Sequence, residues 1–192
     1  ARSSTNTAMA TTTESMPAFA FVPDFPVPAN VGVLQTVRTG GVSTAPWASF
    51  NLGTHVGDDP AHVAANRARL IDLLPREPLW LNQVHGVAVA DADSESGVPE
   101  ADASVARLPG RVCAVMTADC LPVLLCDRAG TVVAAAHAGW RGLCAGVVES
   151  TVATMRVPPG DLLAWLGPAI GPAAFEVGDE VRRPEGDQHV EA

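Results

Sequence analysis

The sequence predicts a single globular domain that contains both α-helices and β-strands. Its 192 residues leave room for one domain with a sizeable core. Hydrophobic residues make up 47% and charged residues 17%, which is typical of a folded chain and not of a disordered one. Short apolar runs of strand length alternate with two longer segments of helical periodicity, and no linker divides them.

The first half of the chain is expected to supply one strand and one helix. Residues 1–18 are polar and low in complexity, so we expect a disordered tail or a cloning remnant there, and one catalytic domain over residues 19–192. Residues 31–36 have the pattern of a strand. Asp59 followed by Pro60 is typical of a helix start, because an N-cap carboxylate accepts from free N–H groups and Pro suits the first helical position. This helix should end near Leu74.

The second half is expected to supply most of the sheet. A hairpin with its turn at residues 127–130 and a helix from about Leu143 to Met155 follow from the apolar pattern. The acidic stretch 91–102 is expected to be a surface loop. The segments expected as strands are apolar runs next to turn residues, namely 79–81, 84–89, 112–116, 121–126, 131–136 and 164–166.

Charge and hydropathy limit the class of partner. The net charge is −9 and no arginine cluster is denser than a pair, which argues against binding to nucleic acid or to an anionic membrane. No apolar stretch approaches the length of about 18 residues that suggests a membrane span, and the first residues lack the apolar core of a signal peptide. We therefore expect a cytoplasmic monomer whose partner is a small molecule.

The hairpin makes two candidate metal ligands neighbours. With Arg128 and Ala129 at its tip, symmetric register puts Cys120 opposite His137 with Cβ atoms about 5 Å apart, which suits two ligands of one tetrahedral ion. A bulge at Gly130 would instead offset this register by one residue. His85 follows an apolar run and is the candidate third ligand. Two histidines and one cysteine leave a fourth position on zinc for water. The open alternatives are structural, hydrogen-bonded histidines, or a metal-free thiolate–imidazolium pair.

Seven segments resemble one known family. They occur in the family's order between about residues 31 and 181 and read RTGGVS, FNLGTHVGDD, WLNQVHG, ADAS, AVMTADCLPVLLCD, AAHAGWRGL and WLGPAIGPAAFEVGDEV. Together they are similar to the YfiH-type family of laccase-domain, or polyphenol oxidase, proteins. The resemblance implies a single layered α+β domain of the α/β/β/α type with mixed β-sheets. Residues 182–192 match nothing in the family pattern, so we expect the C-terminal part of the family fold to be missing.

The resemblance also implies chemistry. It makes His85, Cys120 and His137 ligands of zinc, with copper as the alternative metal, and it makes the same residues catalytic. The implied activity is phosphorolysis of adenosine, inosine and methylthioadenosine, with deamination of adenosine. Purine nucleosides and phosphate are then the partners.

Four further residues receive roles beside this site, each with a plainer alternative. Asp119 is a candidate catalytic base or a turn residue. Arg141 is a candidate phosphate ligand or a solvated side chain. Arg38 can join it or anchor its loop, and Asn51 can hold substrate or satisfy its own backbone.

Three competing functions stay open. A four-copper oxidase needs about ten histidines, whereas this chain has five and no H-x-H pair, so only a single copper with weak oxidation of phenols fits. Cys120 can instead be the nucleophile of an amidase that edits peptidoglycan precursors. In the third reading the metal only braces a non-catalytic protein.

Overall fold

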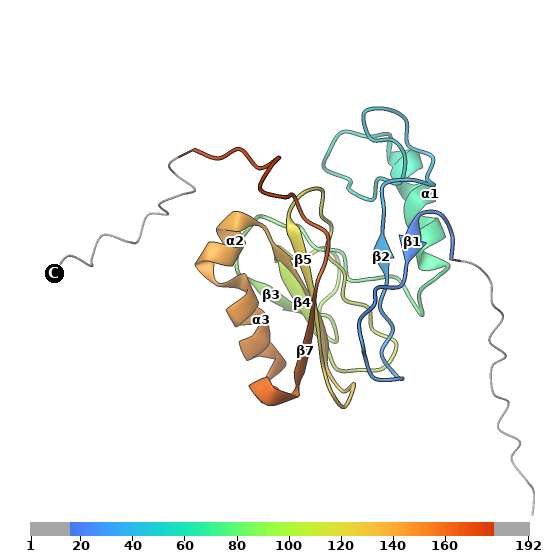
Figure 1. The fold of residues 1–192 in the computed structure, drawn as a ribbon. Coiled ribbons are helices and arrows are strands. Elements are labelled where there is room, and N and C mark those ends of the chain that lie inside the picture. The colour runs from blue at the N-terminus through green and yellow to red at the C-terminus, as the bar shows by residue number, and fades with distance from the viewer. Residues whose placement is uncertain (1–15, 179–192) are drawn as a thin grey trace, which may run out of the picture.

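The computed structural model describes residues 16–178 (Figure 1). Expectations for residues 1–15 and for the unmatched segment 182–192 lie outside this range. Within it, the main sheet has five strands in the order β3-β4-β6-β5-β7. Only the β3–β4 pair is parallel. The strands are β3 (Val89–Asp91), β4 (Ala103–Ala106), β5 (Leu121–Asp127), β6 (Val133–Ala138) and β7 (Leu162–Leu166). The predicted α+β class with mixed sheets is confirmed.

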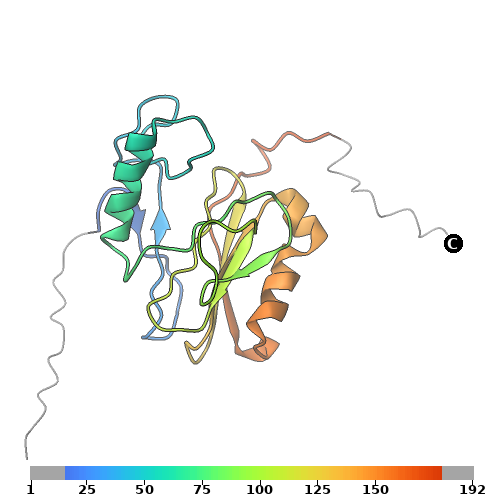
Figure 2. The same cartoon turned by 180° about the vertical axis from the view of Figure 1, so that it is seen from behind.

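Two helices cover one face of the main sheet. These are α2 (Trp140–Ala145) and α3 (Val147–Met155), and a short 3₁₀ turn, η1 (Pro159–Asp161), leads from α3 into β7. Figures 1 and 2 show both helices on the same side of the strands. The core between them contains Val105, Ala136, Val147 and Met155, each at most 1% exposed. Burying these side chains is the main source of stability for this layer.

A smaller unit lies beside the sheet in both views (Figures 1 and 2). It comprises a two-stranded sheet, β1 (Ala20–Phe21) and β2 (Gln35–Thr36), and the helix α1 (Pro60–Ile71). The predicted helix start is confirmed, since Asp59 Oδ1 accepts a 2.8 Å hydrogen bond from the Ala61 N–H. The helix ends before Leu74, because the proline at position 75 disfavours helical geometry in the residue before it.

Several predicted strands are wrong, and at Met116 a side chain satisfies the backbone groups that a ladder would have paired. In 31–36 only Gln35–Thr36 is a strand. Residues 79–81 and 112–116 share one isolated bridge, between Leu79 and Cys113, and residues 84–88 form neither a strand nor a bridge. The Gln83 amide donates to the Met116 carbonyl and accepts from the Met116 N–H, both at 2.8 Å. The Gln83 side chain thus takes the place of a neighbouring strand at Met116, and the apolar residues around it pack without forming a β-ladder.

The predicted helix 143–155 is two helices. Gly146 has φ of 98° and ends α2, so α3 begins afresh at Val147. Val147, Thr151 and Met155 are buried as predicted. Leu143 lies on the other side of the break and is 47% exposed, so its assignment to the same buried face is wrong.

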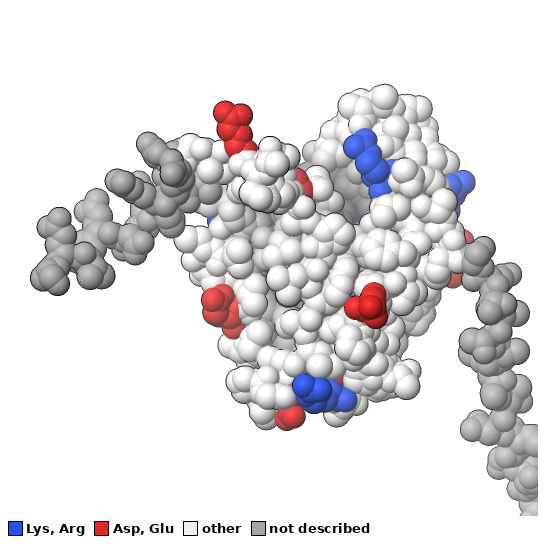
Figure 3. All heavy atoms as spheres, in the orientation of Figure 1, with Lys and Arg blue, Asp and Glu red and all other residues white. Residues whose placement is uncertain are grey.

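Charged side chains are sparse and scattered on the face of the molecule seen in Figure 3. Basic side chains stand singly there, with acidic ones between them, and no basic patch forms on that face. No helix within residues 16–178 is both long enough and apolar enough to cross a membrane.

Candidate metal centre

Three side chains converge at one end of the β5–β6 hairpin. The ligand atoms of His85, Cys120 and His137 all lie within 4.8 Å of one another. The Cys120 Sγ is 3.7 Å from the His85 Nε2, and the two imidazole centroids are 4.7 Å apart with their planes at 68°. In the described part of the chain this is the one group of three or more His, Cys, Asp or Glu residues close enough to hold an ion.

The hairpin brings Cys120 and His137 together in a register other than the predicted one. Pro122, and not Cys120, pairs with His137. The turn is longer than expected, because Asp127 Oδ1 accepts from the N–H groups of Thr131 and Val132 at 2.6 and 3.0 Å. The predicted partner is therefore wrong by two residues. Since side chains alternate along a strand, a shift of two keeps Cys120 toward the side of the sheet on which His137 lies.

His85 reaches the centre through a strained backbone. Its φ is 60°, in the left-handed region that few non-glycine residues adopt. The backbone turns here after residues 79–84, and the imidazole Nε2 lies 3.7 Å from the Cys120 Sγ. It is held by Asp102, whose Oδ1 accepts from the His85 N–H at 2.9 Å.

Asp102 is the site residue that sequence reasoning missed. Residues 91–102 were expected to form a surface loop, but Asp102 is 0% exposed and its Oδ1 lies 2.8 Å from the His137 Nδ1. Burial alone raises the pKa of this carboxyl, but hydrogen bonds from His137 and three backbone N–H groups outweigh it and lower the pKa. A signal was present, because Asp102 stands between two alanines, Ala101 and Ala103, directly before the strand β4.

Space at the centre depends on a glycine. A Cβ on Gly139 would lie 2.7 Å from the His85 Cδ2 and 2.9 Å from the Cys120 Sγ. Cys120 itself is half-buried, and burial followed by the neighbouring Asp119 carboxylate raises the pKa of its thiol. A cation beside the sulfur would favour the thiolate.

The remaining predicted site residues are engaged in different ways. Asp119 is exposed beside Cys120, and Arg141 is exposed with its guanidinium 4.9 Å from the Trp140 ring. Arg38 donates from Nε and Nη2 to the Ala48 carbonyl at 3.1 and 3.0 Å, which anchors its loop. The Asn51 amide donates to the Gly53 carbonyl and accepts from the Gly53 N–H, the pattern of a turn residue.

The donor set suits a borderline-soft cation. Two imidazoles and one thiol match the ligands of a catalytic zinc site, and copper accepts the same donors. The bond between His137 Nδ1 and Asp102 leaves Nε2 as the free donor atom of that ring. His85 is exposed whereas His137 is 4% exposed, so the centre is reached from the His85 side.

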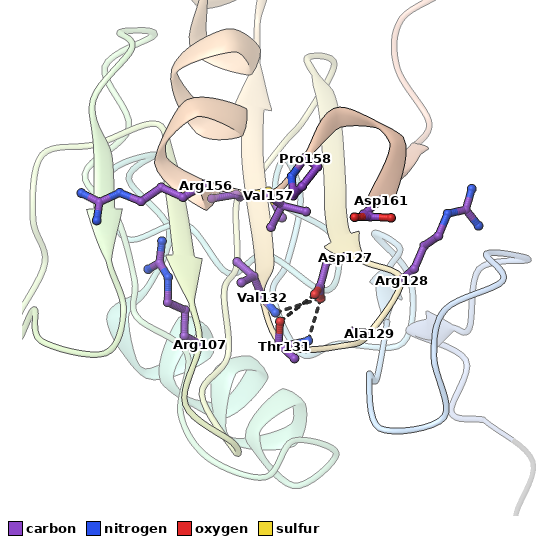
Figure 4. A pocket seen from close by; sticks show the side chains of 11 residues that line it. Arg107, Asp127, Arg128, Ala129, Thr131, Val132, Arg156, Val157, Pro158 and Asp161 are labelled. Atoms are coloured by element: carbon purple, nitrogen blue, oxygen red, sulfur yellow. Dashed lines mark hydrogen bonds between the residues drawn. The ribbon is translucent and has the colours of Figure 1, made fainter.

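A separate hollow of about 500 Å³ lies at the turn end of the hairpin, and Figure 4 shows its lining from residues 127–132 and 155–161. Arg107, Arg128 and Arg156 surround it, but none of the three candidate ligands does. Two of these arginines already donate to backbone carbonyls, Arg107 to Thr154 and Arg128 to Gly160. The hollow is therefore not part of the candidate metal centre.

Comparison with known proteins gives a consistent set of relatives. Residues 32–191 match the family model described as multi-copper polyphenol oxidoreductase laccase. A purine nucleoside phosphorylase of Pseudomonas aeruginosa is 60% identical over 170 residues, covering 88% of this chain and 70% of that protein. The purine nucleoside phosphorylase YfiH of Escherichia coli is 59% identical over 164 residues, covering 84% and 68%.

Solved structures agree with the fold. A Neisseria meningitidis protein is 54% identical with a TM-score of 0.81, covering 85% of this chain and 68% of that one. YlmD from Geobacillus stearothermophilus is 33% identical with a TM-score of 0.70, covering 76% and 60%.

Proposed function

The chain belongs to the multi-copper polyphenol oxidoreductase laccase family, and on that premise we propose that it is a zinc-dependent purine nucleoside phosphorylase. Its substrates in this proposal are adenosine, inosine and methylthioadenosine, and adenosine is also deaminated in a side reaction. The names of relatives up to 60% identical to the chain support the phosphorylase activity. The proposal includes a cytoplasmic monomer.

The observation that carries the proposal is the convergence of His85, Cys120 and His137 within 4.8 Å. Two imidazoles and one sulfur would occupy three positions of a tetrahedral ion and leave the fourth for substrate or water. A closed structural site would need a fourth protein ligand, and the described residues place none in this group. The open side at His85 favours a catalytic role.

The reaction joins phosphate to the sugar carbon and releases the base. The bond from ribose C1′ to the purine nitrogen breaks with its electron pair on the base, and a phosphate oxygen bonds to C1′. A bound zinc would supply Lewis acidity that stabilises developing negative charge. Side chains of the protein would bind the reactants and transfer the proton that the departing base takes up.

Roles for the surrounding residues follow from charge and position. Arg141 would bind phosphate through its exposed guanidinium, which follows Gly139 and Trp140 at the centre. Arg38 would assist through Nη1, the nitrogen that does not donate to Ala48. Asp119 would hold or release a proton at its carboxylate. Asn51 would shape the substrate side by holding its loop through Gly53.

A single copper ion at the same centre is the second candidate, favoured by the same set of donor atoms and by the family description. It would oxidise phenols weakly. An amidase acting through Cys120 is favoured by the 3.7 Å separation of its sulfur from the His85 Nε2. These readings differ in their dependence on metal and on phosphate.

One assay separates the candidates. Purified protein is analysed for metal content and incubated with adenosine or inosine, with and without phosphate, while free base is measured. We expect about one zinc per chain and base release only with phosphate. Cys120→Ala should abolish both, and Cys144→Ala, which alters an exposed cysteine on α2, should abolish neither. Stoichiometric zinc without base release would contradict the phosphorylase proposal, whereas hydrolysis of an amide substrate that survives chelators but not alkylation of Cys120 would favour the amidase.

A further inference from the structure

One buried carboxylate contacts both histidines of the centre. Asp102 is 0% exposed, and each of its two oxygens accepts two hydrogen bonds. Its Oδ1 is 2.8 Å from the His137 Nδ1 and 2.9 Å from the His85 backbone nitrogen. Its Oδ2 accepts from the backbone N–H groups of Val84 at 3.1 Å and Gly86 at 2.7 Å. All four donors therefore depend on a group that can only accept.

The first consequence concerns the protonation of His137. An ionised carboxylate offers no proton, so the hydrogen bond of 2.8 Å requires a proton on the His137 Nδ1. The Nε2 of the neutral ring then carries the lone pair. A lone pair at Nε2 is what a metal ion requires, and the carboxylate behind the ring also fixes the orientation of the imidazole.

The second consequence concerns the backbone of His85. Three successive N–H groups, from Val84 to Gly86, point to the same carboxylate. Successive amides that converge on one anion form a concave nest, and the negative charge stabilises a backbone that is otherwise unfavourable. The left-handed φ of 60° at His85 lies within this nest. Without the carboxylate, the three donors would be left without an acceptor of that strength.

We propose that Asp102 is a positioning residue that prepares both histidine ligands for a metal ion, through the tautomer of His137 and the backbone turn at His85. The backbone of Asp102 joins the same arrangement, because its carbonyl accepts from the His137 N–H at 2.7 Å. The proposal rests on the metal part of the proposed function. In this proposal Asp102 does not bind the ion itself, but it orients two of the three ligands, His85 and His137.

Asp102→Asn tests the proposal with little change in size. A carboxamide places one oxygen and one NH₂ group where two acceptors stood. If the NH₂ replaces Oδ1, it faces His137 and His85, and if it replaces Oδ2, it faces Val84 and Gly86. Either orientation breaks half of the arrangement. Partners of metal ligands are typically worth about 10-fold to 100-fold in metal affinity, and we expect zinc binding to weaken by that factor.

Zinc affinity is measured by competition with a chromophoric chelator, and does not depend on any catalytic activity. Asp127→Asn is the matched control, because Asp127 is also a buried carboxylate and accepts from Thr131 and Val132 at the other end of the hairpin. It should cost stability but leave the dissociation constant of zinc unchanged. Equal zinc affinity in wild type and Asp102→Asn would overturn the proposal.

A second measurement remains decisive even if Asp102→Asn does not fold. Nitrogen-15 NMR of the metal-free wild type at about pH 8, where an ordinary imidazole is neutral, reports the tautomer of each ring. His137→Gln identifies the His137 signals among the five histidines. We expect the proton on Nδ1, and a proton on Nε2 instead would overturn the proposal.

The outcomes also separate this proposal from the proposed function. Zinc binding that weakens in Asp102→Asn supports the positioning role even if no nucleoside is cleaved, in which case only the phosphorylase proposal fails. A wild type that cleaves nucleosides but binds zinc no better than Asp102→Asn removes the positioning role alone. A wild type that binds no zinc overturns both.

Discussion

Replacing Gly139 with alanine should disrupt the metal centre without straining the backbone at the mutated residue. Gly139 has φ of −62° and ψ of 156°, a conformation that alanine adopts freely. The added methyl group, however, would lie 2.7 Å from the His85 Cδ2 and 2.9 Å from the Cys120 Sγ. The effect of Gly139→Ala is therefore steric and falls on two of the three candidate ligands.

The size of the effect follows from these distances. Ordinary van der Waals contact of a Cβ begins at 3.4 Å, so His85 must retreat by about 0.7 Å from its 2.7 Å position. Metal–ligand distances tolerate only about 0.2 Å. Overpacking of this kind costs about 1–3 kcal/mol, and each 1.4 kcal/mol is about tenfold in affinity. We expect zinc binding to weaken by about 5-fold to 150-fold, if the whole cost falls on the metal-bound state.

The assay is the same chelator competition, together with urea unfolding of the metal-free protein to measure any general loss of stability. Gly32→Ala is the matched control, since nothing lies within 4 Å of a Cβ at that position. It should leave zinc affinity unchanged. If Gly139→Ala binds zinc as tightly as wild type, the close approach of Gly139 to His85 and Cys120 is wrong.

Three further predictions concern the parts of the fold that hold the centre. In the folded protein, iodoacetamide should modify the exposed Cys144 and spare Cys113, because burial raises the pKa of Cys113 to about 12. Mass spectrometry that finds Cys113 modified before Cys144 would contradict this order of reactivity. Met155→Ala should lower the free energy of unfolding by about 2–5 kcal/mol, because Met155 is 1% exposed. Leu143→Ala should change it by less than about 0.5 kcal/mol, because Leu143 is 47% exposed. Equal losses of stability in urea unfolding would contradict this difference in burial. Hydrogen bonds from Thr131 and Val132 lower the pKa of Asp127 despite its burial. The ionised carboxylate therefore stabilises the fold above the ordinary pKa of about 4, and this stabilisation is lost as pH falls through the lowered pKa. The difference in unfolding free energy between wild type and Asp127→Asn should shrink over that pH range, and a difference that grows on acidification would contradict the prediction.

The sequence predicted correctly those elements whose signals lie within the elements themselves. The hairpin strands β5 and β6 overlap the apolar runs 121–126 and 131–136, and Asp59 and Pro60 mark the start of α1. The motifs also carried the resemblance to the YfiH-type family, which the family model and the relatives confirm. Each of these conclusions depends on a few neighbouring residues or on an order of motifs, both of which a sequence contains in full.

The predictions that failed depend on contacts across long stretches of chain. Residues 84–89 look like a strand, but the Asp102 carboxylate takes the N–H groups of residues 84–86 and so prevents a ladder. The register of the hairpin differs by two residues because Asp127 bonds Thr131 and Val132 and lengthens the turn. Apolar pattern describes which residues are buried, but it does not say which acceptor satisfies each buried N–H group.

The sequence by itself determined the α+β class, the family and the three residue types that suit a zinc or copper ion. Only the tertiary structure decided that His85, Cys120 and His137 lie within 4.8 Å of one another, and that Asp102 stands behind two of them. The physical reason is that a metal centre is a set of distances between atoms far apart along the chain. Those distances depend on a buried carboxylate, a left-handed histidine and a glycine without a Cβ, each of which acts through packing and not through its neighbours in sequence.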